Sequence, residues 1–199
     1  MKRLLVATRN RGKLKEIRAE LDGLVDELLC AADLPELPET VEDGATFVDN
    51  ALKKAHEACQ ASGLPTLADD SGLVVDGLNG RPGVLSARFA GPDADDAANN
   101  RKLLEELAIL PMASRKAAFV CVMAYVHPDG TSQTFQGRVD GRILDGLRGE
   151  GGFGYDPLFL VDGFQQTMAE LSLEEKNHIS HRGQALNGFR IYLQQQEQG

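Results

Sequence analysis

Three short stretches of the sequence carry side chains that could bind a phosphate group or promote its hydrolysis. The stretch ATRNRGK at residues 7–13 is basic and lies near the N-terminus. The stretch ADDSGL at 68–73 contains the adjacent carboxylates Asp69 and Asp70, and KNHISHRG at 176–183 combines lysine, histidine and arginine. Cationic groups attract phosphates, and carboxylate oxygens are ligands that Mg²⁺ prefers. The three stretches together point to the binding of a small polyanion.

The basic stretch is placed as a strand-to-helix turn. Residues 4–7 form an apolar run typical of a buried strand, and helical periodicity follows from Leu14 onward, with apolar side chains at Ile17, Leu21, Leu24 and Leu28. The N-terminus of a helix presents unpaired N–H groups and the positive end of its dipole, which attract anions. The Walker A pattern nevertheless fails at two of its four fixed positions, because Ala7 replaces a glycine and Leu14 replaces the hydroxyl residue. A different phosphate-binding turn and a solvated basic loop remain equal alternatives.

The acidic pair has two interpretations. Adjacent carboxylates repel one another and are costly to bury, so Asp69 and Asp70 either lie in a solvated turn or hold a metal ion. The preceding acidic loop offers Glu39, Glu42 and Asp43 as further oxygen ligands. If Glu42 and Asp70 converge, a divalent metal there would polarise a phosphoryl group and lower the pKa of an attacking water.

The third stretch is either a polar helix end or a set of donors aimed at base carbonyls or phosphates. Ser180 and His181 are neighbours and would not face each other on a helix, which argues against a Ser–His nucleophile pair. The segment GEGGFG at 149–154 matches G-x-G-x-x-G, but a strand-like segment follows it where a dinucleotide fingerprint requires a helix. A glycine-rich loop that lets the backbone approach a ligand fits the segment better.

The elements that must position these stretches alternate between helix and strand. Helical spacing from Phe47 predicts a helix that ends at Gly63. Residues 64–80 read as a strand, an acidic turn and a second strand, whereas 117–126 and the segment after the HPDG turn read as a β-hairpin. Further helices are expected at 95–107, after the capping box of Ser172 and Glu175, and around Leu186, Phe189 and Leu193. The order predicts an α/β fold with a mixed, partly antiparallel central sheet flanked by helices, in a single domain over 1–199.

Composition narrows the function classes. The chain has 199 residues, a net charge of −9 and 6% aromatic residues, which argues against a broad nucleic-acid-binding surface. No run of 18 apolar residues occurs, and the N-terminus lacks a signal-peptide pattern, so we expect a cytoplasmic protein with no membrane partner. The three cysteines are widely spaced and odd in number, which indicates reduced thiols.

The motifs taken together closely resemble the inosine/xanthosine triphosphate pyrophosphatase family. They are TRNRGK, FVDNALKKA, LADDSGL, RPGVLSARFAG, GGFGYDPLF and LSLEEKNHISHRGQAL, in this order along nearly the whole chain. The resemblance implies hydrolysis of ITP, dITP and XTP to the monophosphate and pyrophosphate, which keeps these nucleotides out of DNA and RNA. It further implies Mg²⁺ as cofactor, a homodimer, and an elongated two-lobed fold with the active-site cleft between the lobes.

The resemblance also implies roles for individual residues. Thr8, Asn10 and Lys13 would grip the triphosphate and Lys54 would add positive charge, while Arg9, Arg11 and Gly12 belong to the same substrate-binding turn without a separate role for either arginine. Glu42 and Asp70 would hold the metal, Asp70 would also be the catalytic base, and Ser71 would lie next to the substrate. Glu39 or Asp43 could replace Glu42, because the loop before it varies in length.

Recognition of the base would fall to the later motifs. The resemblance places Phe153, Gly154, Tyr155 and Asp156 in the base pocket, with Phe153 stacked on the purine, and assigns the 6-oxo group to Lys176, His181 and Arg182. Cationic donors satisfy a 6-oxo acceptor but would oppose the 6-amino donor of adenine, and such hydrogen bonds can discriminate by roughly 10⁴ to 10⁵. The alternatives are a Maf-like pyrophosphatase acting on modified or pyrimidine triphosphates and a nucleic-acid-binding module. The FGYDP and SHR blocks argue against the first, and the net charge argues against the second.

Overall fold

The computed structural model describes residues 1–111 and 115–196 and contains two compact units. Unit 1 comprises Met1–Asp70, Cys121–Gly137 and the chain from Arg182 onward, and unit 2 comprises Ser71–Val120 and Arg138–His181. The expectation of a single domain over 1–199 stays a prediction.

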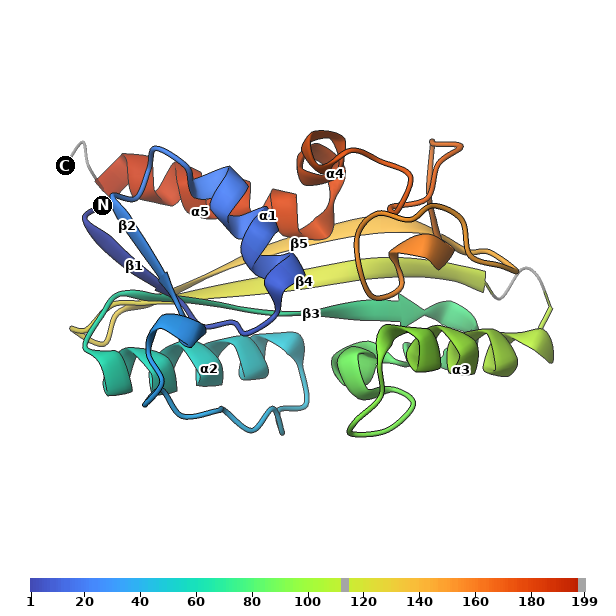
Figure 1. The fold of residues 1–199 in the computed structure, drawn as a ribbon, viewed down its shortest axis with the longest axis horizontal. Helices are drawn as coiled ribbons and strands as arrows, with labels where there is room; N and C mark the ends of the chain where they lie inside the picture. Colours follow the sequence, from blue (N-terminus) through green and yellow to red (C-terminus); the bar gives the residue numbers. More distant parts are fainter. Residues whose placement is uncertain (112–114, 197–199) are drawn as a thin grey trace. The chain divides into compact units, whose positions relative to one another are not determined.

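The described strands form a mixed six-stranded sheet in the order β2-β1-β3-β4-β5-β6 (Figure 1). The strands are β1 (Arg3–Val6), β2 (Glu27–Cys30), β3 (Thr66–Val75), β4 (Lys116–Val126), β5 (Ser132–Ile143) and β6 (Phe159–Val161). Strand β1 pairs in parallel with both β2 and β3, whereas β5 and β6 are antiparallel. The predicted mixed sheet and the β4–β5 hairpin are therefore confirmed.

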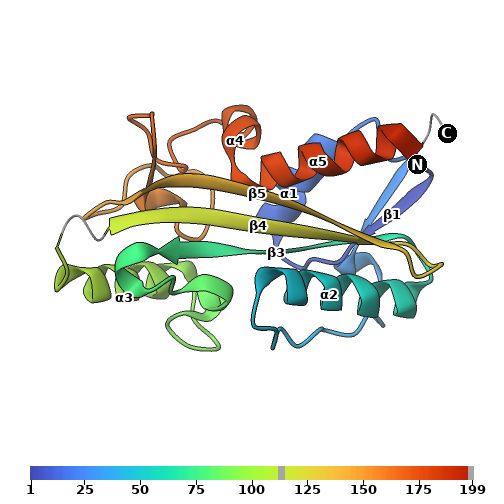
Figure 2. The ribbon, with the colours of Figure 1, turned by 180° about the vertical axis from the view of Figure 1, so that it is seen from behind.

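Helices flank the strands, which confirms the α/β class. They are α1 (Arg11–Leu21), α2 (Phe47–Ser62), α3 (Asp96–Ala108), α4 (Leu173–Ile179) and α5 (His181–Gln196). In unit 1, α2 lies on one face of the strands and α1 and α5 lie on the other (Figures 1 and 2). No helix in the described part of the chain is long and apolar enough to span a lipid bilayer.

Strand β4 shows how the sequence builds two apolar layers in unit 1. Successive side chains of a strand point to opposite faces. Cys121, Met123 and Tyr125 belong to the buried cluster that includes Leu186 and Phe189 of α5. The alternate residues Val122, Ala124 and Val126 belong to a second buried cluster, together with Ala51, Ala55 and Cys59 of α2. The near-continuous apolar run at 117–126 is thus explained by burial on both faces.

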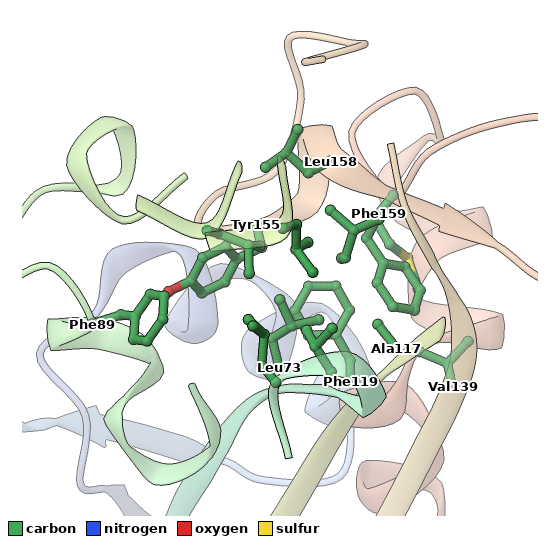
Figure 3. Packing of buried hydrophobic residues seen from close by; sticks show 14 of the residues in the cluster. Leu73, Phe89, Ala117, Phe119, Val139, Tyr155, Leu158 and Phe159 are labelled. Carbon is green, nitrogen blue, oxygen red and sulfur yellow. The ribbon is translucent and has the colours of Figure 1, made fainter. Parts of the chain in front are cut away.

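Unit 2 has its own hydrophobic core. Figure 3 shows this core, with Tyr155 beside Phe89 at one side, Phe159 of β6 at the other, and Leu73 of β3 and Phe119 of β4 between them. The ring centroids of Phe119 and Phe159 lie 4.5 Å apart in a tilted arrangement that aromatic pairs favour. This core fixes the base of the glycine-rich loop that precedes β6.

The helix boundaries agree well with the local capping signals. Thr46 and Asp49 form a capping box at the start of α2, which ends at Gly63 in the left-handed conformation with φ of 67°. The predicted capping box of Ser172 and Glu175 opens α4. All three cysteines are buried and free, as expected for reduced thiols.

Two predicted elements are wrong. Helix α1 ends at Leu21, followed by Gly23 with φ of 73°, so Leu24 lies outside the helix and Leu28 lies in β2. An apolar residue at helical spacing after the end of a helix can equally well be a residue of the strand that follows. Residues 66–75 form one continuous strand where a strand, a turn and a second strand were predicted. The acidic pair stays within a buried strand because its carboxylates have cationic and amide partners.

Candidate active site

The basic turn after β1 is built largely by its own side chains. The N–H of Ala7 donates to the carbonyl of Leu67 over 2.9 Å, which sets the turn beside β3. Asn10 is the N-cap of α1, with Oδ1 accepting from the N–H of Lys13 over 3.0 Å, and Thr8 Oγ1 accepts from the N–H of Asn10 over 3.2 Å. The first turn of an 11-residue helix, an anion-attracting position, therefore begins here.

Lys13 connects this turn to a buried ion network. Its ammonium lies 3.0 Å from Asp69, and the Arg182 guanidinium lies 3.2 Å from the same carboxylate and also contacts Glu16. Asp69, Arg182 and Glu16 are all at most 3% exposed. Burial acts to raise the pKa of Asp69, but the charges of Lys13 and Arg182 outweigh it and hold that pKa far below its ordinary value. Asp69 is thus an ionised anchor that orients Lys13.

The two proposed metal ligands share one lysine. Lys54 Nζ lies 2.6 Å from Glu42 Oε1 and 3.8 Å from Asp70 Oδ1. Asn50 Nδ2 donates to the other oxygen, Asp70 Oδ2, over 3.0 Å. Asp43, by contrast, pairs with Lys53 and is largely exposed, and Glu39 is exposed as well. Among the three acidic residues considered, Glu42 has the contact that brings it into the Asp70 cluster.

The Glu42–Asp70 pair has the chemistry that a divalent cation requires. Burial raises the pKa of Asp70, Lys54 and Asn50 oppose that shift, and the nearby Glu42 carboxylate adds to it. A cation bound by both carboxylates would relieve this electrostatic cost. In the described residues, no group of three or more His, Cys, Asp or Glu side chains could enclose a metal. Mg²⁺ commonly takes one or two carboxylates and completes its shell with water and substrate phosphates, so two carboxylates suffice.

A second cluster, in unit 2, is formed around the glycine-rich loop. Asp156 Oδ2 accepts from Lys176 Nζ over 2.6 Å and from the N–H of Phe153 over 2.9 Å. Lys176 Nζ also lies 4.8 Å from the centroid of the Phe153 ring, within cation–π range. One buried carboxylate therefore fixes both a cationic donor and an aromatic residue.

Helix α3 holds the same loop from another direction. Asp96 accepts from the N–H of Gly154 over 2.7 Å, and Asn100 donates to the carbonyl of Gly154 over 2.9 Å. At Gly152, φ is 71°, and an added Cβ would lie 2.1 Å from Asp156 Oδ2. Glycine is required there for both the backbone conformation and the close approach.

Tyr155 and His181 are positioned by packing. Tyr155 is buried in the core of unit 2, and its hydroxyl donates to the carbonyl of Ser86 over 2.8 Å (Figure 3). Burial raises the pKa of Tyr155. The His181 ring stacks on Phe119 with centroids 4.9 Å apart. A direct contact of either side chain with substrate stays a prediction.

The structure decides one of the alternatives that the sequence left open. Asp69 and Asp70 are 2% and 4% exposed, so the solvated-turn interpretation is wrong. The segment 176–183 does contain a helix end, with Lys176 and His178 in the last turn of α4, but Lys176, His181 and Arg182 are buried. In the basic turn, Arg9, Asn10 and Arg11 are exposed, Thr8 and Gly12 are partly exposed, and Ser71 follows Asp70 on β3, also partly exposed.

The sequence analysis missed two residues that position the site and considered a different role for a third. Glu16 pairs with Arg182 and Asn50 bonds to Asp70, whereas Asp69, considered as a metal ligand or a solvated residue, anchors Lys13. Glu16 lies three residues after Lys13 and next to the apolar Ile17. This position near the buried face of the helix was the signal that could have indicated a buried, paired carboxylate. Asn50 offered a similar signal, since it precedes Ala51 on the buried face of α2.

The Ham1 family model matches residues 4–192. The chain belongs to the Ham1 family. A dITP/XTP pyrophosphatase of Geobacter sulfurreducens is 60% identical over 193 residues, which cover 97% of each chain. One of Desulforamulus reducens is 49% identical over 199 residues, covering 98% of this chain and 99% of that relative.

Solved Ham1 structures have the same fold. The HAM1 protein from Coxiella burnetii superposes with a TM-score of 0.88 at 41% identity, covering 98% of this chain and 100% of that one. The Ham1 protein of Staphylococcus aureus gives a TM-score of 0.86 at 40% identity, covering 98% and 99%. The family resemblance read from the six motifs is therefore confirmed along nearly the full length of the Ham1 relatives.

Proposed function

We propose that this chain is a dITP/XTP pyrophosphatase that hydrolyses ITP, dITP and XTP to the nucleoside monophosphate and pyrophosphate. Removal of these deaminated nucleotides would prevent their incorporation into DNA and RNA. Relatives named dITP/XTP pyrophosphatase at up to 60% identity support the activity. The observation that carries the proposal is the Glu42–Lys54–Asp70 cluster in the same unit as the basic turn.

The residues of unit 1 are assigned to the triphosphate. Thr8, Asn10, Gly12 and Lys13 would bind phosphate oxygens at the N-terminus of α1, where N–H groups and a lysine are close together. The ammonium of Lys54 contacts two carboxylates. The phosphates of a bound substrate would compete with these carboxylates for the ammonium, and Lys54 would then stabilise the departing pyrophosphate. Asp70 would accept a proton from the water that attacks the α-phosphorus, and Ser71 would contact the substrate.

Glu42 and Asp70 are the residues that would hold Mg²⁺. When bound, the ion supplies charge neutralisation for the phosphates and acidifies a bound water. The exposed Arg9 and Arg11 would contribute long-range attraction for a polyanion. The buried Arg182 is paired with Glu16 and Asp69, so its main contribution in this proposal is to keep Asp69, and through it Lys13, in place.

The residues of unit 2 are assigned to the purine base. Phe153 would stack on the ring, Gly154 and Asp156 would shape the loop, and Lys176 would donate to the 6-oxo group. His181 would act as a further donor. A 6-amino group, as in adenine, presents a second donor to Lys176 and leaves the ammonium without an acceptor, so ATP would be a poor substrate.

Three further expectations accompany this function. The family resemblance supports a homodimer, which light scattering would test. The net charge of −9 supports a protein without a nucleic-acid partner, which a binding assay at low salt would test. A cytoplasmic location fits an enzyme that acts on the nucleotide pool, and cell fractionation would test it.

A substrate panel tests the proposed function. The chain is incubated with ITP, dITP, XTP, GTP, ATP, dTTP and UTP in the presence of Mg²⁺, and the products are separated by ion-exchange chromatography. We expect monophosphate and pyrophosphate from ITP, dITP and XTP, with kcat/KM for ATP lower by roughly 10² or more. Preferred hydrolysis of the pyrimidine nucleotides would support a Maf-like activity, and release of diphosphate and inorganic phosphate would contradict the proposal.

A further inference from the structure

Asn50, on the buried face of α2, joins the two segments that carry Glu42 and Asp70. The residue is 0% exposed. Its Oδ1 accepts from the N–H of Gly44, two residues after Glu42, over 2.8 Å. Its Nδ2 donates to Asp70 Oδ2 over 3.0 Å. One side-chain amide therefore bridges the acidic loop and strand β3.

The chemistry of the two partners fixes the orientation of this amide. A backbone N–H can only donate, and an ionised carboxylate can only accept. Rotating the amide by 180° would place its oxygen against the carboxylate and its NH₂ against the N–H, so both contacts would become repulsive. Asn is the residue whose short side chain provides one acceptor and one donor in this arrangement, whereas Asp provides acceptors only.

The close approach of Gly44 is an independent sign that this bridge is built into the fold. A Cβ added at Gly44 would lie 2.6 Å from Asn50 Oδ1 and 2.8 Å from Asp49 Cβ, closer than real Cβ contacts allow. Any larger residue would displace the loop from Asn50. On the other side of Glu42, Lys53 Nζ donates to the carbonyl of Val41 over 2.9 Å, so α2 holds the loop on both sides of the carboxylate.

We propose that Asn50 is a positioning residue for the cation site, which fixes the Asp70 carboxylate by donation to Oδ2 and fixes the Glu42 loop by acceptance from Gly44. The proposal rests on the assignment of Glu42 and Asp70 under the proposed function. A donor bound to Oδ2 defines the rotation of the carboxyl group and hence the direction in which Oδ1 faces. Partners that orient metal-binding side chains in this way typically contribute 10- to 100-fold to metal affinity or activity.

Two substitutions separate the roles of the two hydrogen bonds that Asn50 makes, one to Gly44 and one to Asp70. Asn50→Ala removes both hydrogen bonds. Asn50→Asp keeps an acceptor for the N–H of Gly44 but replaces the donor to Asp70 by a repelling carboxylate. If Asn50 acted only by holding the loop, Asn50→Asp would retain wild-type kcat. We expect kcat for ITP at saturating Mg²⁺ to fall about 10- to 100-fold in both variants.

Asn99 provides a matched control. It is also a buried asparagine, on α3 in unit 2, with Oδ1 accepting from the N–H of Ala90 over 2.8 Å and Nδ2 donating to the carbonyl of Ala87 over 3.1 Å. Asn99→Ala also loses one accepted and one donated hydrogen bond, but both partners of the amide are backbone groups and no carboxylate is involved. We expect it to lower Tm by an amount similar to that in Asn50→Ala while Mn²⁺ affinity stays within about threefold.

The decisive measurement is the dissociation constant for Mn²⁺ in the absence of nucleotide. Free Mn²⁺ is quantified by its electron paramagnetic resonance signal. We expect the dissociation constant to rise about 10- to 100-fold in Asn50→Ala and to rise less, about 3- to 10-fold, in Gly44→Ala, which keeps Asn50 and shifts the loop. Gly44→Ala also serves if Asn50→Ala does not fold. An Asn50→Ala dissociation constant within twofold of wild type, or no Mn²⁺ binding by the wild type, would overturn the proposal.

The outcomes distinguish this inference from the proposed function. A wild-type protein that releases no pyrophosphate from ITP, dITP or XTP would contradict the proposed function, whereas the Mn²⁺ comparison would still decide the role of Asn50. Wild-type pyrophosphatase activity with kcat unchanged in Asn50→Asp would contradict the positioning role alone.

Discussion

The candidate cluster in unit 1 and the candidate cluster in unit 2 differ in the number of charged groups that they contain. The cluster in unit 1 combines four carboxylates with three cations, and Asp69, Lys54 and Arg182 each contact two oppositely charged groups. Its members are Glu16, Glu42, Asp69, Asp70, Lys13, Lys54 and Arg182. The cluster in unit 2 has one buried ion pair, Lys176 with Asp156. A triphosphate and its metal bring several charges and need groups that can exchange partners. Recognition of a purine base instead needs donors held in fixed directions.

This difference means that substitutions in the two clusters should affect different kinetic constants. Loss of a charge in unit 1 should lower kcat, because charge develops on the phosphates as the bond breaks. Loss of a contact in unit 2 should raise KM and reduce discrimination between bases, because the base does not react.

Asp70→Asn should have the largest effect. The substitution is isosteric but removes the negative charge and the basic oxygen, so kcat for ITP should fall about 10³-fold or more, while Tm and the circular dichroism spectrum stay close to wild type. Steady-state release of pyrophosphate checks the expectation. Asp26→Asn, at an exposed site, is the control and should stay within twofold of wild type. Near wild-type pyrophosphate release by Asp70→Asn would remove Asp70 from the chemistry.

Lys176→Met should have the next largest effect and should act on both stability and selectivity. It leaves the buried Asp156 without its ammonium partner, which typically costs about 3–5 kcal/mol of unfolding free energy. The ratio of kcat/KM for ITP to that for ATP should fall by about 10² or more, because the proposed donor to the 6-oxo group is lost.

The double variant Asp156→Asn/Lys176→Met separates these two effects. It removes both charges, so urea unfolding should show recovery of much of the stability lost in the single variant. Selectivity should remain low, because no cationic donor has been restored. Recovery of ITP selectivity together with stability would show that Lys176 acts on the fold alone.

Phe153→Ala should have a smaller, purely binding effect. Stacking of an aromatic side chain on a base contributes about 1–3 kcal/mol, so KM for ITP should rise roughly 5- to 150-fold, with kcat changed far less. Steady-state kinetics with ITP and XTP checks this division. An equal loss in kcat with KM unchanged would place Phe153 in the chemical step and would contradict the comparison between the clusters.

Arg9→Ala should have the smallest effect. Arg9 is exposed, and its guanidinium donates to the carbonyl of Leu37 over 3.2 Å. A surface contact of this kind contributes about 1 kcal/mol or less, so kcat should change by no more than about twofold and any change in KM should diminish as salt is raised. A tenfold loss of kcat that persists at high salt would show that Arg9 touches the reacting phosphates.

Much of the fold was predictable because local signals and burial agree. The capping box at Ser172, the glycine at 63 and the apolar run of β4 each predicted the element that the structure contains. The helix predicted through Leu28 failed because apolar spacing does not distinguish the end of a helix from the strand that follows it.

The candidate site was less predictable because it depends on partners distant in sequence. Asp69 lies in a strand interior because Lys13 and Arg182 neutralise it, and these residues are 56 and 113 positions away, which no local pattern reveals. Asn50 looked like an ordinary polar residue in a helix. The resemblance to a family identified the candidate metal-binding residues, whereas the structure adds the residues that hold their side chains in place.

Hydrolysis of ITP in ¹⁸O-labelled water tests the central claim most directly. The proposed mechanism requires attack of water at the α-phosphorus, so mass spectrometry should find one labelled oxygen in the IMP and none in the pyrophosphate. Label in the pyrophosphate would show attack at the β-phosphorus, and labelled inorganic phosphate with IDP would show attack at the γ-phosphorus. Either of those results would contradict the assignment of the unit 1 cluster.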